Sequence, residues 1–280
     1  MSKILEMVVS KQLNTYLERN DLYCDKQSGY RSYHSCETLN VKMFDNILKQ
    51  IDEGNIVALV LLDMSAAFDT VDHKILLGAL KTGYGLDGNV LRCSSYLTGR
   101  KFRVKVHNSF SEYLNALFGV PHGSILGPIL FILYTKHLQH IASKFGLFIE
   151  LYADDTQLYI GFKNNDQNNT CIDRISNCLY EIKCWVCGQY LKLNEGKTKF
   201  LLLAKPSVHN LLVDTDYLKI TSMNTDINEV NWGIESQVKT LGIRLDPALD
   251  MSNHISYVRQ SCIGKLKSWK SIATLLDEVD

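Results

Sequence analysis

The chain has 280 residues, 46% of them hydrophobic and 21% charged, and its thirty basic residues balance thirty acidic ones. This composition is ordinary for a soluble globular protein of one large or two modest domains, and a net charge of zero means that any nucleic-acid-binding function must rest on local sites. No apolar run reaches the roughly 18 residues of a membrane-spanning helix and no signal-type core follows the N-terminus, so we expect an intracellular protein with no membrane partner.

Eight cysteines at irregular spacing predict reduced core thiols and not a disulfide framework. Cys184 and Cys187 form a C-x-x-C pair, and a zinc site with Cys171 and Cys178 is one interpretation. Apolar residues recur at helical spacing through this segment, however, and structural zinc sites usually lie on tight turns, so packing of a helix is favoured.

In chain order, the first strong pattern lies at residues 34–53, where helical spacing predicts an amphipathic helix with an apolar face of Leu39, Phe44, Ile47, Leu48 and Ile51. Residues 55–63 (NIVALVLLD) are short, β-branched and continuously apolar, which predicts a buried strand that ends at Asp63. Two helices are expected next, at residues 73–84 with Asp72 as their cap and at residues 89–100.

Residues 100–108 (RKFRVKVHN) alternate in polarity, so we expect a strand with one basic face, paired with residues 112–120. The patterns that follow predict a long apolar helix at 124–145, a strand, turn and strand at 149–162, a helix at 166–190, short strands at 199–204, 217–221 and 238–246, and a final helix at 254–276. Acid-bearing strands among long helices favour an α+β fold in one continuous unit over a regular βαβ series.

Two adjacent acids interrupt the apolar stretch IELYADDTQLYIGF at residues 149–162. Asp154 and Asp155 repel each other and resist burial unless positive charge compensates them. If the strand before Asp63 neighbours this hairpin, three carboxylates converge at one end of a sheet, an arrangement that holds hard divalent cations such as Mg²⁺. Acidic pairs in exposed turns are common, so the apolar flanks and Asp63 carry the prediction of a catalytic site.

Several longer motifs occur in one order along the chain: ALVLLDMSAAFDTVDH, GVPHGSILGPILFILY, YADDTQLY, YLKLNEGKTKF and VKTLGIRLDPAL. They resemble the reverse transcriptase motifs of non-LTR retrotransposons, particularly the jockey and chicken-repeat-like lineages, and DKQSGYRSYHSCETL is similar to the fingers segment that precedes them. The resemblance runs from about residue 3 to at least residue 255. It implies an α+β fold with a right-hand polymerase palm, partial fingers and the start of a thumb.

The resemblance implies RNA-directed DNA synthesis with two Mg²⁺ ions, which Mn²⁺ can replace. Asp63 and Asp154 match the aspartates that ligate both metals, Asp155 matches the supporting third acid, and the backbone carbonyl of Met64 is expected to complete the nucleotide-side metal site. Lys197 matches a lysine proposed to protonate the departing pyrophosphate, with a solvated surface charge as the alternative.

Phe68 falls where reverse transcriptases place an aromatic ring that excludes a 2′-hydroxyl, with simple core packing as the alternative. Ala66 and Ala67 leave room for that ring and for the triphosphate. Gly123 resembles the turn that enters a nucleotide-contacting helix. It follows His122, where most relatives have glutamine, so an amide is replaced by a shorter, titratable ring.

Leu241, Gly242 and Arg244 resemble the hairpin that holds the primer end, and Ser124 belongs to the template-contacting helix. Arg31 is matched to a template or nucleotide contact, with an ordinary exposed arginine as the alternative. The expected partners are an RNA template, a DNA primer and deoxynucleoside triphosphates. Copying onto chromosomal target DNA implies a nuclear location.

The resemblance divides the chain into fingers-like residues 1–55 and about 74–118, palm residues 56–73 and 119–248, and the beginning of a thumb helix at 249–280. The basic fingertip hairpin, the full thumb and the endonuclease of complete elements have no match here, so we expect a chain truncated at both ends with weak or no processive synthesis. The alternatives are a retrotransposon remnant, a palm co-opted to bind nucleic acid or protein, and an RNA-templated RNA polymerase, which Phe68 opposes.

Overall fold

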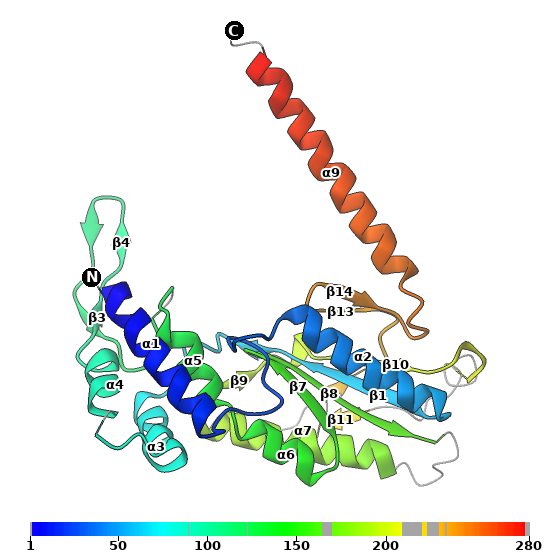
Figure 1. The fold of residues 1–280 in the computed structure, drawn as a ribbon, viewed down its shortest axis with the longest axis horizontal. Coiled ribbons are helices and arrows are strands. Elements are labelled where there is room, and N and C mark those ends of the chain that lie inside the picture. Colours follow the sequence, from blue (N-terminus) through cyan, green and yellow to red (C-terminus); the bar gives the residue numbers. More distant parts are fainter. Residues whose placement is uncertain are drawn as a thin grey trace.

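The computed structural model describes residues 2–88, 90–121, 123–163, 170–208, 220–222, 230–232 and 234–277. Its central element is a four-stranded antiparallel sheet in the order β10-β1-β8-β7. The strands are β1 (Ile56–Leu62), β7 (Phe148–Tyr152), β8 (Asp155–Phe162) and β10 (Lys199–Leu203) (Figure 1). This sheet among long helices confirms the predicted α+β class.

Strand β1 is buried along its whole length, as its continuous hydrophobicity predicts. Its alternate residues enter two cores, one on each face of the sheet, with Ile56, Ala58, Val60 and Leu62 in the first and Val57, Leu59 and Leu61 in the second. Because each fully buried aliphatic side chain contributes about 1.5–3 kcal/mol, β1 fixes the position of the residue that follows it, Asp63.

Helix α2 (Cys36–Asp52) covers one face of the sheet, and α6 (Leu138–Lys144) and α7 (Thr170–Gly188) lie along the other (Figure 1). The predicted apolar face of α2 is correct for Leu39, Ile47 and Ile51. It is wrong for Leu48, which is exposed, while Met43 is fully buried. Met43 lies four residues before Ile47, so the buried stripe runs one position earlier than we expected.

Helices α1 (Ser2–Arg19), α3 (His73–Tyr84), α4 (Val90–Leu97) and α5 (Leu126–Tyr134) lie beside the sheet (Figure 1). Helix α3 is confirmed with its predicted cap, because the Asp72 carboxylate accepts the Lys74 and Ile75 amides at 2.8 and 2.9 Å. Helix α1 was not predicted from its pattern. Its buried positions include the polar residues Glu6 and Ser10, which breaks the apolar periodicity.

The single helix predicted at 124–145 is wrong, because residues 135–137 separate α5 from α6. The Thr135 hydroxyl donates to the Phe131 carbonyl at 3.2 Å, a side-chain bond that competes with continuation of the helix. The next residue, Lys136, donates to the Leu22 carbonyl at 2.8 Å. These contacts redirect the chain so that α6 packs against β7 and α7.

Between α4 and α5 the chain forms a double hairpin over residues 100–115, called the arm below, which projects from the body in Figure 1. Strand β3 (Lys101–Phe102) pairs with β6 (Leu114–Asn115), and β4 (Lys105–Val106) pairs with β5 (Ser109–Phe110). The strand predicted at 100–108 is therefore interrupted. The Val104 amide donates to the Ser111 hydroxyl at 2.9 Å, so a side chain replaces a ladder bond there.

Shorter elements complete the fold. Strand β2 (Met64–Ser65) pairs with β9 (Lys192–Leu193), which the short helix η1 (Glu195–Lys197) follows. The strand predicted at 199–204 is confirmed as β10, and the segment 238–246 forms the hairpin of β13 (Val238–Thr240) and β14 (Ile243–Leu245). The predicted final helix is α9 (Ser252–Asp277), which extends away from the sheet (Figure 1).

Three predicted segments lie partly outside the described residues. The helix predicted at 89–100 is α4 (Val90–Leu97), and residue 89 before it is not described. Strand β11 (Ile220–Ser222), which pairs with β12 (Val230–Trp232), overlaps the strand predicted at 217–221, of which residues 217–219 are not described. The helix predicted at 166–190 is α7, and residues 164–169 before it are not described.

Helix α7 carries four of the eight cysteines. Cys171 and Cys178 are buried thiols outside any disulfide, as predicted, whereas Cys184 and Cys187 are exposed, as is Cys262 on α9, so the expectation of core thiols is wrong for these three. The C-x-x-C pair lies on a regular helix, in agreement with the packing interpretation. Among the described helices, none combines the length and the hydrophobicity needed to cross a membrane.

Candidate active site

The register of the sheet brings the three predicted carboxylates to one edge. Strands β1 and β8 are antiparallel with Leu62 opposite Thr156, so Asp63, which follows β1, lies beside Asp155, which begins β8. Asp154 occupies the turn between β7 and β8, where Tyr152 pairs with Asp155. The predicted convergence of these strand ends is confirmed.

Burial and mutual repulsion both act on these acids. Burial raises the pKa of Asp154 above its ordinary value, and the charge of Asp63 raises it further. Burial also raises the pKa of Asp155, with smaller contributions from the charges of Asp154 and Asp63. The pKa of the nearby Tyr30 phenol is raised by burial and then by Asp154. Acids that disfavour one another's ionisation form a site for added positive charge.

Lys197 lies at the same edge of the sheet. Its ammonium nitrogen is 3.7 Å from the Asp63 carboxylate, but the side chain is 71% exposed, so the ion pair is weak and the lysine has room to move. The amide of Asn194 donates to the Asp63 carbonyl at 2.8 Å, and the amide of Lys197 donates to the Asn194 carbonyl at 3.1 Å. Met64 pairs with Leu193 in the same small ladder.

A hollow of about 260 Å³ extends from the carboxylates to the β13–β14 hairpin. Asp63, Asp155 and Lys197 line it together with Leu241 and Gly242 of the hairpin turn. Lys199 and Lys239 line it as well and add positive charge that the sequence motifs did not indicate. The predicted catalytic residues Asp63, Asp155 and Lys197 therefore share one cavity with the predicted primer-end residues Leu241 and Gly242, whereas Asp154 and Arg244 do not line it.

The hairpin turn facing this hollow is held in a fixed position. Leu241 and Gly242 have φ angles of 43° and 84°, so the backbone follows a left-handed path there. The Gln157 amide donates to the Thr240 hydroxyl at 3.3 Å, which links the turn to β8. Arg244 stacks over Tyr257 of α9, with its guanidinium carbon 4.2 Å from the ring centre.

Residues 66–68 form the loop after β2. Ala66 has a φ of 48° and its carbonyl accepts the Asp69 amide at 2.9 Å, which makes a tight turn. Ala67 is buried, and the half-buried Phe68 ring packs on Phe131 with 4.6 Å between ring centres. Phe68 thus has one face against the core while part of the ring stays accessible, an arrangement compatible with both of its predicted roles.

Sequence reasoning missed Gln27, which supports the acidic turn. Its side-chain carbonyl accepts the Gly29 amide at 2.7 Å and the Ala153 amide at 3.1 Å. Ala153 precedes Asp154 and has a φ of 59°, a strained value for a residue with a Cβ atom. Gln27 is only 2% exposed, and its side-chain NH₂ has no hydrogen-bond partner among the described residues. The sequence signal for Gln27 was its place in QSG, because Gly29 permits close approach of the neighbouring backbone at Ala153.

The same segment adds to the sheet. The Ser28 amide donates to the Leu151 carbonyl and the Leu151 amide to the Lys26 carbonyl, both at 2.8 Å, so residues 26–28 run beside β7 as a parallel bridge. A Cβ atom on Gly29 would lie 2.4 Å from the Ala153 nitrogen. The segment therefore locks the turn that carries Asp154.

Other predicted residues lie in different surroundings. Gly123 has a φ of 68°, and the Ser124 hydroxyl accepts the Gly127 amide at 3.0 Å, so these two residues form the turn and cap before α5. Within the described part of the chain, no backbone hydrogen bond joins them to the carboxylates. His122 lies outside the described residues.

Arg31 is not the exposed arginine of the alternative interpretation. Its side chain is 13% exposed, pairs with Glu18 at 3.3 Å and donates to the Cys24 carbonyl at 3.1 Å. It also stacks over Tyr23, 4.8 Å from the ring centre. These contacts join the segment after α1 to α1 itself, so binding a nucleotide requires Arg31 to leave them.

The carboxylates fit a hard cation by their chemistry. In the described part of the chain no three His, Cys, Asp or Glu side chains are gathered into a ready-made ion site. Asp63, Asp154 and Asp155 share one edge of the sheet and offer only oxygen ligands, the type that Mg²⁺ and Mn²⁺ prefer. Burial, and after it the repulsion between the acids, raises the pKa of Asp154 and Asp155, and a bound cation would favour their ionised forms against both effects.

Comparison with known proteins gives relatives along nearly the whole chain. The chain is 28% identical over 273 residues to the probable RNA-directed DNA polymerase from transposon BS of Drosophila melanogaster, covering 95% of this chain and 28% of that protein. It is 26% identical to the corresponding protein of transposon X-element from the same species and 25% identical to that of mobile element jockey from Drosophila funebris. The chain spans 27–28% of the length of these relatives.

Solved structures share the fold at low sequence identity. Apo telomerase from Candida tropicalis, truncated from its C-terminal domain, aligns over 88% of this chain and 44% of its own, with a TM-score of 0.54 and 14% identity. Telomerase from Candida albicans in complex with a TWJ fragment of telomeric RNA covers 89% of this chain and 38% of its own, with a TM-score of 0.55 and 16% identity. Residues 1–245 match the family described as reverse transcriptase (RNA-dependent DNA polymerase), and the chain belongs to that family.

Proposed function

We propose that this chain is the catalytic part of an RNA-directed DNA polymerase, which adds deoxynucleotides to the 3′-hydroxyl of a DNA primer along an RNA template. The observation that carries the proposal is the convergence of Asp63, Asp154 and Asp155 at one sheet edge, beside Lys197 and the β13–β14 turn. Family membership supplies the reaction class, and this edge supplies the groups that the reaction needs.

Asp63 and Asp154, with the backbone carbonyl of Met64, are proposed to hold two Mg²⁺ ions, for which Mn²⁺ can substitute. Such ions stabilise the attacking and leaving oxygens of an in-line phosphoryl displacement. Asp155 keeps the negative charge of the site high and, from the first residue of β8, orients the turn. Lys197 is proposed to donate a proton to the departing pyrophosphate, a role that its exposed ammonium beside Asp63 permits.

The nucleotide is proposed to lie over the loop after β2. Phe68 presents the accessible part of its ring to the sugar, so that a 2′-hydroxyl clashes, and Ala66 and Ala67 keep the loop narrow. His122, Gly123 and Arg31 complete the predicted nucleotide contacts, Arg31 only after it leaves Glu18.

The primer end is proposed to rest on Leu241, Gly242 and Arg244, because the left-handed turn directs backbone groups toward the hollow shared with Asp63. Ser124 is the predicted template contact at the start of α5. In this division, residues 1–55 and about 74–118 act as fingers, 56–73 and 119–248 as palm, and 249–280 as the beginning of the thumb. Copying onto chromosomal DNA places the reaction in the nucleus.

Primer extension tests the proposal. The 280-residue chain is incubated with Mg²⁺, a labelled DNA primer annealed to an RNA template, and either dNTPs or NTPs. We expect extension with dNTPs that Asp154→Asn abolishes, while Asp250→Asn, which changes an exposed aspartate at the start of α9, has no effect. Extension with NTPs alone contradicts the proposal, and so does the absence of extension under conditions where the chain binds the primer–template.

A further inference from the structure

The arm and the residues that flank it have a composition unlike that of the chain as a whole. Residues 98–118 contain four Lys or Arg residues and one acid, Glu112, in a protein whose net charge is zero. The same segment carries four aromatic residues, Phe102, Phe110, Tyr113 and Phe118. Basic and aromatic residues interleaved in this way are typical of surfaces that bind unpaired nucleotides.

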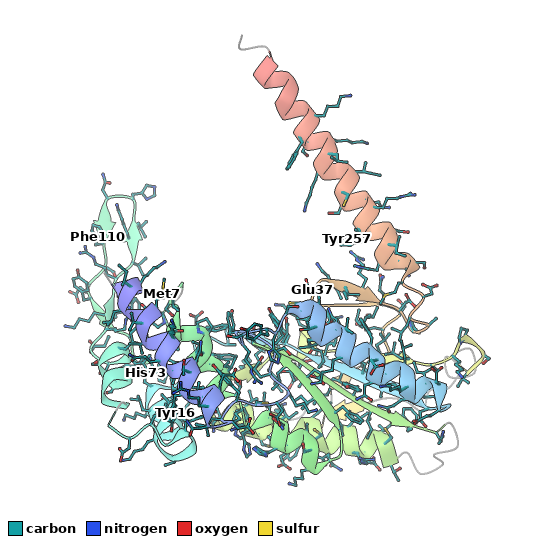
Figure 2. The ribbon with its side chains drawn as sticks, viewed as in Figure 1. Met7, Tyr16, Glu37, His73, Phe110 and Tyr257 are labelled. Carbon is teal, nitrogen blue, oxygen red and sulfur yellow. The ribbon has the colours of Figure 1, made fainter. Side chains whose placement is uncertain are left out.

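These side chains face solvent. Every residue from 98 to 115 is exposed, with Tyr113 at 61% and Phe102 and Phe110 at 50%. A hairpin without a hydrophobic core is only marginally stable on its own. Burial of these exposed rings against a partner would therefore stabilise the arm, because the chain itself does not bury them. Figure 2 shows the side chain of Phe110 on the part of the arm that projects farthest from the body.

Cation–π contacts organise the arm. The guanidinium carbon of Arg103 lies 3.9 Å from the centre of the Phe110 ring and 5.0 Å from that of Tyr113. The Lys105 ammonium lies 5.5 Å from the Phe110 ring, and Arg100 stacks on Tyr96 at 5.4 Å. The cations are therefore held over the rings, where phosphate contacts and base stacking can be made together.

The base of the arm is connected to the candidate active site. The amides of Gly119 and Val120 donate to the carbonyls of Val71 and Phe68, both at 2.8 Å, so the returning strand is tied to the loop after Asp63. Phe118 contacts Tyr190, with 6.3 Å between ring centres. Tyr190 is 63% exposed and comes just before β9, which pairs with Met64. Exposed rings thus continue from the arm toward the carboxylates.

We propose that the arm, residues 100–115, with Phe118 and Tyr190 at its base, binds a single-stranded nucleic acid and guides it to the carboxylate edge. The charge of the arm complements phosphates, and its rings need unstacked bases, which a duplex does not offer. The inference rests on the proposed function and deepens it, since an RNA template is the single strand that a reverse transcriptase must present to its active site.

A binding experiment tests the arm without catalysis. A labelled single-stranded RNA of about 20 nucleotides, enough to cover one binding groove, is titrated with the full chain in EDTA and without nucleotides, over a range of salt concentrations. The arm variant carries Arg103→Ala and Lys105→Ala. The matched control carries Lys163→Ala and Lys205→Ala, two lysines that follow β8 and β10 at the opposite end of the sheet from Asp63.

We expect the arm variant to bind the RNA at least about tenfold more weakly, whereas the control binds like the wild type. The plot of log K against log salt should become less steep for the arm variant, with the magnitude of its negative slope reduced by about 1.4 because two cations are lost. Tyr113→Leu should weaken RNA binding roughly five- to a hundredfold without changing the salt slope, and should leave binding of duplex DNA unchanged. All variants must unfold in urea as the wild type does, which we expect because every substituted residue lies on the surface.

Equal losses in the arm variant and the control overturn the inference, and so does a Tyr113→Leu effect of the same size on duplex DNA. The result separates from that of primer extension. If the arm variant loses RNA binding while the wild type fails to extend a primer, the inference about the arm is supported and the proposed reaction is contradicted. If the wild type extends a primer and the arm variant binds normally, the arm inference alone fails.

Discussion

At the scale of single residues, the candidate active site lowers the stability of the fold through Asp154 and Asp155. Both acids have a raised pKa because of burial and neighbouring negative charge, so part of the stability of the fold is given up to keep them together. Relief of such a conflict typically stabilises a protein by about 0.5–2 kcal/mol. The same acids should therefore lower stability without metal and confer metal-dependent stability.

For Asp154→Asn we expect a higher free energy of unfolding than the wild type in EDTA, by about 0.5–2 kcal/mol, because one repelling charge is gone. Saturating Mg²⁺ should raise the stability of the wild type through binding to the folded state and should raise that of the variant much less. Urea unfolding with EDTA and with Mg²⁺ measures both effects. A variant that is less stable than the wild type in EDTA contradicts this account.

Gln27 gives a second prediction at this scale. Gln27→Met keeps the side-chain volume but removes the acceptor of the Gly29 and Ala153 amides, which should cost about 1–3 kcal/mol of stability. Since the turn that carries Asp154 then loses its support, primer extension at saturating dNTP should slow by about tenfold or more, with unchanged primer–template affinity. The control is Gln50→Met, a half-buried glutamine on α2. Loss of affinity without loss of rate would exclude a positioning role.

At the scale of elements, the contact between residues 26–29 and β7 decides the geometry of the acidic turn. Gly29→Ala places a Cβ atom 2.4 Å from the Ala153 nitrogen, so the backbone must shift, at a cost of about 1–3 kcal/mol. Gly78→Ala is the matched control, because nothing lies within 4 Å of its added Cβ. In the middle of α3 it should stabilise by about 0.5–1 kcal/mol. Thermal unfolding should shift in opposite directions for the two variants.

The junction of α2 and β7 should make stability depend on pH. Glu150 is buried on β7 and pairs with Lys42 of α2 at 3.0 Å. Burial raises the pKa of Glu150 more than the Lys42 hydrogen bond and charge lower it, so the folded chain holds this proton more tightly than the unfolded one. The free energy of unfolding therefore falls as pH rises from the ordinary carboxyl pKa through the raised value.

Glu150→Gln cannot ionise and should lack this fall. The stability of the wild type minus that of the variant should decrease as the pH rises above the ordinary carboxyl pKa and should become constant once the pH has passed the raised pKa of Glu150. Lys42→Gln, which removes the partner, should extend the decrease to higher pH. Urea unfolding over this pH range measures the difference, and parallel curves for wild type and Glu150→Gln would contradict the assignment.

Some of the elements could be predicted from the sequence, and others could not. Strand β1, helix α2 and the β7–β8 hairpin follow from their own periodicity, and the convergence of Asp63 with Asp154 follows from pairing their strands. The break between α5 and α6 depends on Lys136 reaching the Leu22 carbonyl, a contact between residues far apart in sequence. The role of Gln27 was missed for the same reason, because its contact with Ala153 depends on the tertiary structure and not on a local sequence pattern.

At the scale of the whole molecule, net neutrality conceals a local separation of charge. The arm and α9 leave the body on the same side in Figure 1, and Figure 2 shows Phe110 on one and Tyr257 on the other. An arginine stacks on each of these rings, Arg103 on Phe110 and Arg244 on Tyr257. The acids of the candidate site are thus accompanied by cations on the arm and on the β13–β14 hairpin beside α9, which the total charge does not reveal.

The order of the sheet also governs how the chain folds while it is being synthesised. Strand β1 ends at Leu62, but its two neighbours, β8 and β10, begin only at Asp155 and Lys199. Until the ribosome has released those later residues, an entirely apolar strand has no partner on either edge, and such a strand is prone to aggregate. The carboxylate site therefore forms late in folding, after most of the chain has been made.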